Sequence, residues 1–166
     1  MYVRYCNSLN EIFTVINGDD DGSSNITLPR LTKLNLNNLP NLKIVYKGSI
    51  PCGIFSCLQS LYISNCHSIE KLLPPQFDQQ LPNLETISVR YCDSMKEIFE
   101  KSNSDDNSSI ALPKLRKLDL WSLPELKIVC KGSISCECSP EFDIYDCPNL
   151  EMHPTIEIKD FVIPLF

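Results

Sequence analysis

The sequence predicts a solenoid, a stack of coils whose short parallel strands lie side by side, and two observations lead to this prediction. First, the 23 residues from Leu28 to Ile50 return as Leu112 to Ile134, with 16 identical positions. Second, the apolar residues of both copies follow the spacing LxxLxLxxLxxLxxV. This spacing suits a short strand followed by a turn with further inward residues, and it does not suit an isolated amphipathic helix. Such a rhythm is typical of a leucine-rich-repeat solenoid.

Six coils are predicted, each with one short parallel strand on the concave face. The strand centres share one inward position of the rhythm: Val3, Leu36, Ile63, Val89, Leu120 and Ile144. They are separated by 33, 27, 26, 31 and 24 residues, whereas such repeats usually take about 20 to 29 residues. The two longest spacings contain the acidic segments 17–25 and 101–109, which are rich in Ser and Asn and are therefore predicted to be inserted loops.

The remaining part of each coil contains little that predicts a helix. Prolines lie outside the strand centres, where a missing N–H breaks no ladder, so we expect a mostly irregular convex side with little helix. Residues 1–153 are predicted to form the solenoid, and residues 154–166 a capping strand and tail, because Ile156 and Ile158 alternate as in a strand. Since Met1 already lies at a strand position, we expect the chain to be the C-terminal piece of a longer protein, or a truncated product of one.

The composition narrows the range of functions. The formal net charge of −6 argues against nucleic acid and anionic membrane as main partners, since both need clustered Lys and Arg. No apolar run reaches the roughly 20 residues of a membrane span, and the N-terminal segment lacks the apolar core of a signal peptide, so we expect a cytoplasmic, intracellular protein. There is no GxxxxGKS/T phosphate loop, and His67 and His153 have no partner at metal-binding or catalytic spacing. The sequence therefore predicts no enzyme, no cofactor and no metal.

The nine cysteines raise the question of disulfides or zinc. Four of them follow a strand centre by three residues, a buried position of the rhythm, and are expected to be inward, reduced thiols: Cys6, Cys66, Cys92 and Cys147. The pairs Cys52 with Cys57 and Cys136 with Cys138 could supply thiolates to zinc. However, the equivalent residues Cys52 and Cys136 lie about three coils apart in a solenoid, which is beyond the reach of one ion.

The outward side chains of the strands carry the best functional signal. Strand alternation places five of the six tyrosines and the only tryptophan on the outer face of the sheet, but none of the seven phenylalanines. Tyr, Trp and Arg anchor protein interfaces because they bury a large area and keep a polar group, although Tyr and Trp also favour strands for structural reasons. The predicted protein-binding residues are Tyr62, Arg90, Tyr91, Asp119, Trp121, Asp143 and Tyr145.

Longer phrases of the sequence point to a family. LPNLETISVRYCDSMKEIF and FDIYDCPNL, with the alternation of LP-initiated and Cys-containing repeats, resemble the C-terminal leucine-rich repeats of plant disease-resistance proteins of the coiled-coil, nucleotide-binding type. The resemblance covers about residues 1–153. It implies recognition of a pathogen effector or a guarded host protein, with a nucleotide-binding domain as a further partner. Nucleotide binding itself is not carried over, because this chain has no phosphate loop.

Two functions therefore remain open. The first is the protein-recognition module of a plant innate-immune receptor, with a protein-binding concave face and no turnover. The second is a leucine-rich-repeat adaptor or scaffold unrelated to immunity, such as the substrate-binding arm of a ubiquitin ligase. An upstream phosphate loop would favour the receptor, and an upstream F-box-like helical segment would favour the adaptor.

Overall fold

The computed structural model describes residues 1–14, 31–47, 53–73, 81–100, 109–151 and 155–158. The predicted acidic loop at 17–25, nearly all of the one at 101–109, and the end of the predicted tail at 159–166 lie outside the described residues.

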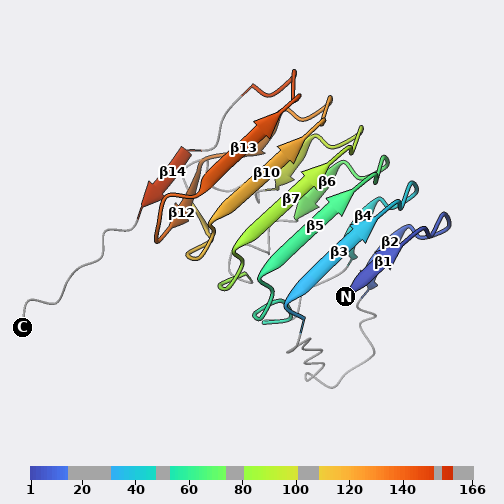
Figure 1. The fold of residues 1–166 in the computed structure, drawn as a ribbon, viewed down its shortest axis with the longest axis horizontal. Coiled ribbons are helices and arrows are strands. Elements are labelled where there is room, and N and C mark those ends of the chain that lie inside the picture. Colours follow the sequence, from blue (N-terminus) through green and yellow to red (C-terminus); the bar gives the residue numbers. More distant parts are fainter. Residues whose placement is uncertain (15–30, 48–52, 74–80, 101–108, 152–154, 159–166) are drawn as a thin grey trace, which may run out of the picture.

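Six strands form one parallel sheet, called the main sheet below, in the order β1-β3-β5-β7-β10-β13 (Figure 1). The strands are β1 (Tyr2–Arg4), β3 (Lys33–Asn37), β5 (Ser60–Ser64), β7 (Thr86–Arg90), β10 (Lys117–Trp121) and β13 (Glu141–Tyr145). Their register sets the six predicted centres directly opposite one another, from Val3 to Ile144. The predicted solenoid, with its six strands and their centres, is therefore confirmed.

Shorter parallel strands form the other sides of the stack. β2 (Glu11–Thr14) pairs with β4 (Ile44–Lys47), and a three-stranded sheet joins β6 (Lys71–Leu73), β8 (Glu97–Phe99) and β11 (Ile128–Cys130). These strands run behind the main sheet (Figure 1). We call β2, β4, β6, β8 and β11 together the back layer.

A further three-stranded sheet contains β9 (Ile110–Ala111), β12 (Ser133–Cys136) and β14 (Thr155–Ile158). The described residues contain no helix, as expected, but the convex side is more regular than the sequence analysis predicted. Runs such as Ile44–Lys47 and Glu97–Phe99 are rich in β-branched and aromatic residues, which favour strands. Because they follow the main strand at a constant distance in each coil, they align from coil to coil.

The core lies between these layers and is one continuous cluster of apolar side chains. In β3 and β5 the inward residues are buried and the outward ones half-buried, which is the period of two expected for a strand with one covered face. Leu36 and Leu120 are 0% exposed, and each is stacked between its equivalents in the neighbouring coils. Val3 and Ile144, in the two terminal strands of the main sheet, are only half-buried.

Every main strand ends in the same turn, because the residue that follows it has a positive φ between 48° and 56°. These six residues are Tyr5, Asn38, Asn65, Tyr91, Ser122 and Asp146. In the first five of them, the backbone N–H donates to the last residue of the next main strand, as Tyr91 N–H does to the Trp121 carbonyl at 2.9 Å. Asn and Asp accept this left-handed conformation readily, whereas a bulky tyrosine does so only at a cost.

The structure corrects the prediction for two cysteines. Cys66 and Cys92 are fully buried, and burial raises the pKa of their thiols to about 11 and about 12. Cys6 is exposed and Cys147 half-buried, because both lie in terminal coils that a neighbouring described coil covers on one side only. Cys130 and Cys136 are also buried, although they are not among the four cysteines predicted to point inward. The described residues contain no disulfide.

Candidate functional site

The outward side chains of the main sheet form three rows that cross the strands. The first row is Lys33, Ser60, Thr86, Lys117 and Glu141. The second is Tyr2, Asn35, Tyr62, Ser88, Asp119 and Asp143, and the third is Arg4, Asn37, Ser64, Arg90, Trp121 and Tyr145. The predicted site residues all belong to the second and third rows, except Tyr91, which occupies the turn directly after β7. The register thus brings them onto one face.

A buried carboxylate holds Arg90 in place. Asp119 is only 2% exposed, and its Oδ2 accepts hydrogen bonds from the Ser88 hydroxyl at 2.9 Å and from the Nε and Nη2 of Arg90. A buried charge is tolerated when it is paired and hydrogen-bonded in this way. The other oxygen, Oδ1, is buried and has no partner among the described residues. Asp119 therefore lies beneath the surface and orients Arg90. It was predicted to bind a partner directly, but the exposed side chain of this pair is that of Arg90.

Three of the predicted residues make a continuous stack across β7, β10 and β13. The Arg90 guanidinium lies 5.3 Å from the centre of the Trp121 ring, and the Trp121 and Tyr145 rings are 5.1 Å apart. These are distances for cation–π and aromatic contacts. Trp121, which was predicted to lie on the outer face of the sheet, is half-buried there. Tyr145 is 63% exposed, and Tyr91, in the turn after β7, is 45% exposed.

Beside this stack the main sheet has a hollow of about 390 Å³, which we call the sheet hollow. Its lining consists of Asn35, Tyr62, Ile63, Ser64, Thr86, Ser88, Arg90, Lys117 and Asp119. The hollow exists because the outward residues Ser64, Thr86 and Ser88 are small, whereas larger side chains flank them. Lys33 lies over the Tyr62 ring, with its Nζ 4.6 Å from the ring centre. The sequence pattern contains these small residues, but their placement between large ones becomes evident only from the register.

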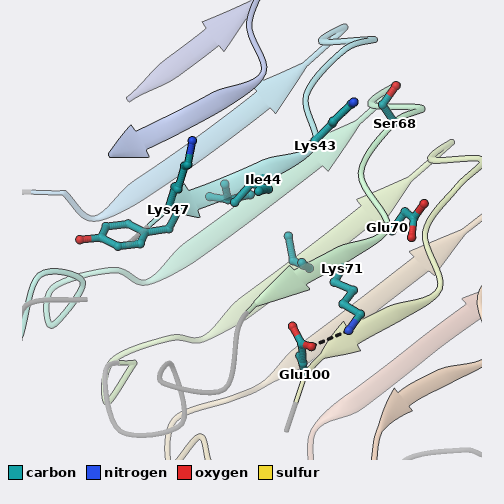
Figure 2. Close-up of a pocket in the computed structure, with 10 residues that line it drawn as sticks. Lys43, Ile44, Lys47, Ser68, Glu70, Lys71 and Glu100 are labelled. Atoms are coloured by element: carbon teal, nitrogen blue, oxygen red, sulfur yellow. Dashed lines mark hydrogen bonds and ion pairs between the residues drawn. The ribbon is translucent and has the colours of Figure 1, made fainter. Parts of the chain in front are cut away.

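A second hollow, of about 590 Å³, lies in the back layer between β4 and β6 (Figure 2). At most junctions between coils, a carbonyl of one coil accepts two backbone N–H groups of the next; Glu70 O, for example, accepts from Lys96 and Glu97. Among the described residues, Lys43 O accepts no such bond from Glu70 or Lys71. The back layer is therefore interrupted there. Ion pairs of Lys71 with Glu100 and of Lys96 with Glu70 neutralise one wall of this hollow.

The described residues contain no group of three or more His, Cys, Asp or Glu side chains that could hold a metal ion. His67 Nδ1 lies 2.9 Å from Asp93 Oδ2, and the two side chains are 43% and 65% exposed. In the described part of the chain, no helix is long and apolar enough to cross a membrane. The features that the site offers are therefore aromatic surface, oriented charge and a shallow hollow, which suit the binding of another macromolecule.

The comparisons with known proteins agree with this architecture. Residues 1–90 and 47–158 match the family model "Plant disease resistance protein RPS2-like, leucine-rich repeats". Disease resistance protein At4g27190 of Arabidopsis thaliana is 28% identical over 130 residues, which are 72% of this chain and 13% of that protein. Probable disease resistance protein At4g27220 of the same plant is 29% identical over 132 residues, 77% of this chain and 14% of that protein.

The chain thus spans only 13% and 14% of the length of these two relatives, and no solved structure matches it. The family model, in contrast, covers the whole of the main sheet and the back layer. The family match extends over the same coils whose register places the outward rows on one face. This chain belongs to the RPS2-like leucine-rich-repeat family of plant disease resistance proteins.

Proposed function

We propose that this chain is the protein-recognition module of a plant innate-immune receptor, and that it binds a pathogen effector or a guarded host protein on the concave outer face of the main sheet. The contact surface is formed by Tyr62, Arg90, Tyr91, Trp121 and Tyr145, with Asp143 at its edge. Asp119 acts from below by orienting Arg90. The module works in the cytoplasm, without catalysis, and a nucleotide-binding domain of the longer protein is its second partner.

The stack of Arg90, Trp121 and Tyr145 is the observation that carries this proposal. Interfaces take most of their binding energy from a few Trp, Tyr and Arg side chains near the centre. Side chains that are already fixed lose little conformational entropy on binding, and here the buried Asp119 fixes Arg90 while the ring contact fixes Trp121. The surface is therefore ordered before a partner arrives.

Charge along the sheet favours one orientation of the partner. Arg4 and Lys33 lie in the first two strands, and Glu141 and Asp143 in the last, with Asp146 in the turn that follows it. A partner of opposite polarity along its length would associate faster, because complementary potentials steer the encounter. This effect weakens as salt screens the charges.

The test is affinity capture from an extract of infected leaves, with the immobilised chain and three variants. Trp121→Ala should reduce recovery of the specific partner about 30-fold, since truncation of a central tryptophan costs on the order of 2 kcal/mol or more. Tyr2→Ala is the matched control, because Tyr2 is an exposed aromatic residue of the same sheet outside the proposed surface. Arg90→Ala should also lose binding, but it leaves Asp119 buried without its cation, so its thermal stability must be measured beside it.

The proposal is wrong if Trp121→Ala captures the same proteins in the same amounts as the unchanged chain. It is equally wrong if binding is lost only in variants whose thermal unfolding shows that they no longer fold. Loss of binding in Tyr2→Ala to the same extent would place the contact elsewhere on the main sheet.

A further inference from the structure

We propose that the sheet hollow takes up carboxylate side chains from an acidic segment of the protein partner. This inference rests on the proposed function of the main sheet, and it adds the chemistry of the segment that is recognised. The hollow, at about 390 Å³, lies near the lower end of the range of about 300 to 1,000 Å³ for binding pockets. It has room for side chains of a partner.

Three cationic side chains surround the sheet hollow. Arg90 and Lys117 line it, and Lys33 reaches its edge over the Tyr62 ring. Lys33 and Lys117 belong to the same row, with only the small residues Ser60 and Thr86 between them. They are therefore about 14 Å apart along the sheet, since neighbouring strands are spaced by about 4.8 Å. An extended acidic segment that crosses the strands could meet both lysines.

The negative charges near the sheet hollow do not cancel this positive potential at its surface. The Asp119 side chain is 4% exposed, whereas the Arg90 side chain with which it pairs is 44% exposed, so the cation faces solvent and the anion does not. Arg90 uses Nε and Nη2 on Asp119, and its Nη1 makes no hydrogen bond within the described residues. That group is free to donate to an incoming carboxylate, for which the planar guanidinium is the best-suited side chain.

Among the described residues, the one other carboxylate that pairs with these cations is that of Glu141. It lies 3.7 Å from Lys117 Nζ, on the side away from Thr86, and its side chain is 70% exposed. An ion pair this exposed is weak and can exchange for a ligand carboxylate. The cations around the sheet hollow contrast with the net charge of −6 of the chain, which as a whole repels acidic peptides. Any binding of such a peptide must therefore come from a local site.

The experiment uses hexaglutamate, acetylated and amidated at its ends, as the probe and hexaglutamine as its neutral counterpart. Trp121 is the only tryptophan of the chain, and its ring is 5.3 Å from the Arg90 guanidinium, so its fluorescence reports events at the edge of the sheet hollow. We expect a saturable change with hexaglutamate that weakens with added salt, and no change with hexaglutamine. Lys117→Gln and Lys33→Gln should each weaken binding about three- to fivefold, the usual size of one partly exposed ion pair.

Lys43→Gln is the matched control, because Lys43 is an exposed lysine at the other hollow, in the back layer. It should leave the affinity for hexaglutamate unchanged. Equal weakening by Lys43→Gln and Lys117→Gln, or equal binding of the two peptides, would overturn the inference. So would tighter binding of inorganic phosphate than of hexaglutamate, since the sheet hollow would then be a general anion site.

These outcomes are separable from those of the capture experiment. If hexaglutamate does not bind while Trp121→Ala still loses its partner, the inference about carboxylates fails and the proposed recognition surface stands. If hexaglutamate binds as expected while Trp121→Ala keeps its partner, the proposed function of the stack fails instead.

Discussion

At the scale of single residues, Tyr91 shows a conflict between stability and surface chemistry. Its φ of 55° is one that an L-residue with a bulky side chain adopts only at a cost of roughly 1 to 2 kcal/mol. Asn38 and Asn65 occupy the same turn in other coils without that cost, because asparagine tolerates the conformation. Strain of this kind is often retained where the side chain has a function, and the Tyr91 side chain is one of the exposed residues of the proposed surface.

We therefore expect Tyr91→Asn to stabilise the fold by about 1 kcal/mol and to weaken partner capture. The midpoint of urea unfolding measures the first effect, and the capture experiment measures the second. The reverse change, Asn65→Tyr, is the control and should destabilise the fold by a similar amount. A lower midpoint for Tyr91→Asn would mean that the Tyr91 side chain contributes more to packing than its backbone conformation costs.

The buried thiols lead to a prediction about pH. Burial raises the pKa of Cys66 and Cys136 to about 11 and that of Cys92 to about 12, from an ordinary value of 9.0. In the unfolded chain these thiols ionise near pH 9, so the folded state retains their protons longer. Their contribution to stability is complete below pH 9 and is lost as the pH rises from 9 towards 11 to 12.

We accordingly expect Cys66, Cys92, Cys130 and Cys136 to resist alkylation at pH 8 in the folded protein, while Cys6 and Cys138 react quickly. Mass spectrometry of the alkylated protein identifies the modified residues. The free energy of unfolding should also fall between pH 9 and 11. Rapid labelling of Cys92 under native conditions would contradict its burial.

At the scale of elements, the junction between β4 and β6 differs from its neighbours. β6 and β8 are joined by backbone bonds, including Glu97 N–H to Glu70 O at 3.2 Å, whereas Lys43 O accepts neither the Glu70 nor the Lys71 N–H. On the opposite side of the same coils, β3 and β5 are paired over five residues. The main sheet is thus continuous where the back layer is open.

Amide hydrogen exchange should reveal this difference. We expect the N–H groups of Glu70 and Lys71 to exchange at least about tenfold faster than those of Lys96 and Glu97, because they have no backbone acceptor across the junction among the described residues, and an amide without an acceptor exchanges without opening of the fold. Exchange measured by NMR resolves the four residues in one experiment. Equal protection of both pairs would show that the two coils are bonded in solution.

The same elements show how far the sequence could predict the fold. The positions of Leu36 and Ile63 were predictable, since each coil must place an apolar residue at the same inward point and the spacing repeats. The interruption between β4 and β6 was not, because the two strands individually have ordinary strand sequences. The burial of Asp119 was also missed: alternation puts it outward like Asn35, and only the neighbouring Ser88 and Arg90 make it a covered, paired group.

At the scale of the whole molecule, the described residues form one core, and no contact between strands of the first and last coils closes the stack from end to end. Stability in such a stack is a sum over coils and over the interfaces between neighbouring coils. An inner coil takes part in two of these interfaces, and a terminal coil of the main sheet in only one among the described residues. The cost of a cavity should therefore depend on the position of the coil, even for residues at equivalent points of the repeat.

Leu36→Ala and Leu120→Ala should each cost about 2 to 5 kcal/mol, because both residues are 0% exposed and are packed from two sides. Val3→Ala removes only part of a half-buried side chain in β1 and should cost roughly 1 kcal/mol or less. Urea unfolding followed by circular dichroism measures the three values, and amide exchange shows which coils open.

Because the core is a single cluster that extends past the open junction of the back layer, we expect one cooperative transition for both leucine variants. Two separate transitions would contradict this expectation. If the coils up to β4 unfolded independently of the coils from β6 onward, the main sheet alone would not couple the two halves.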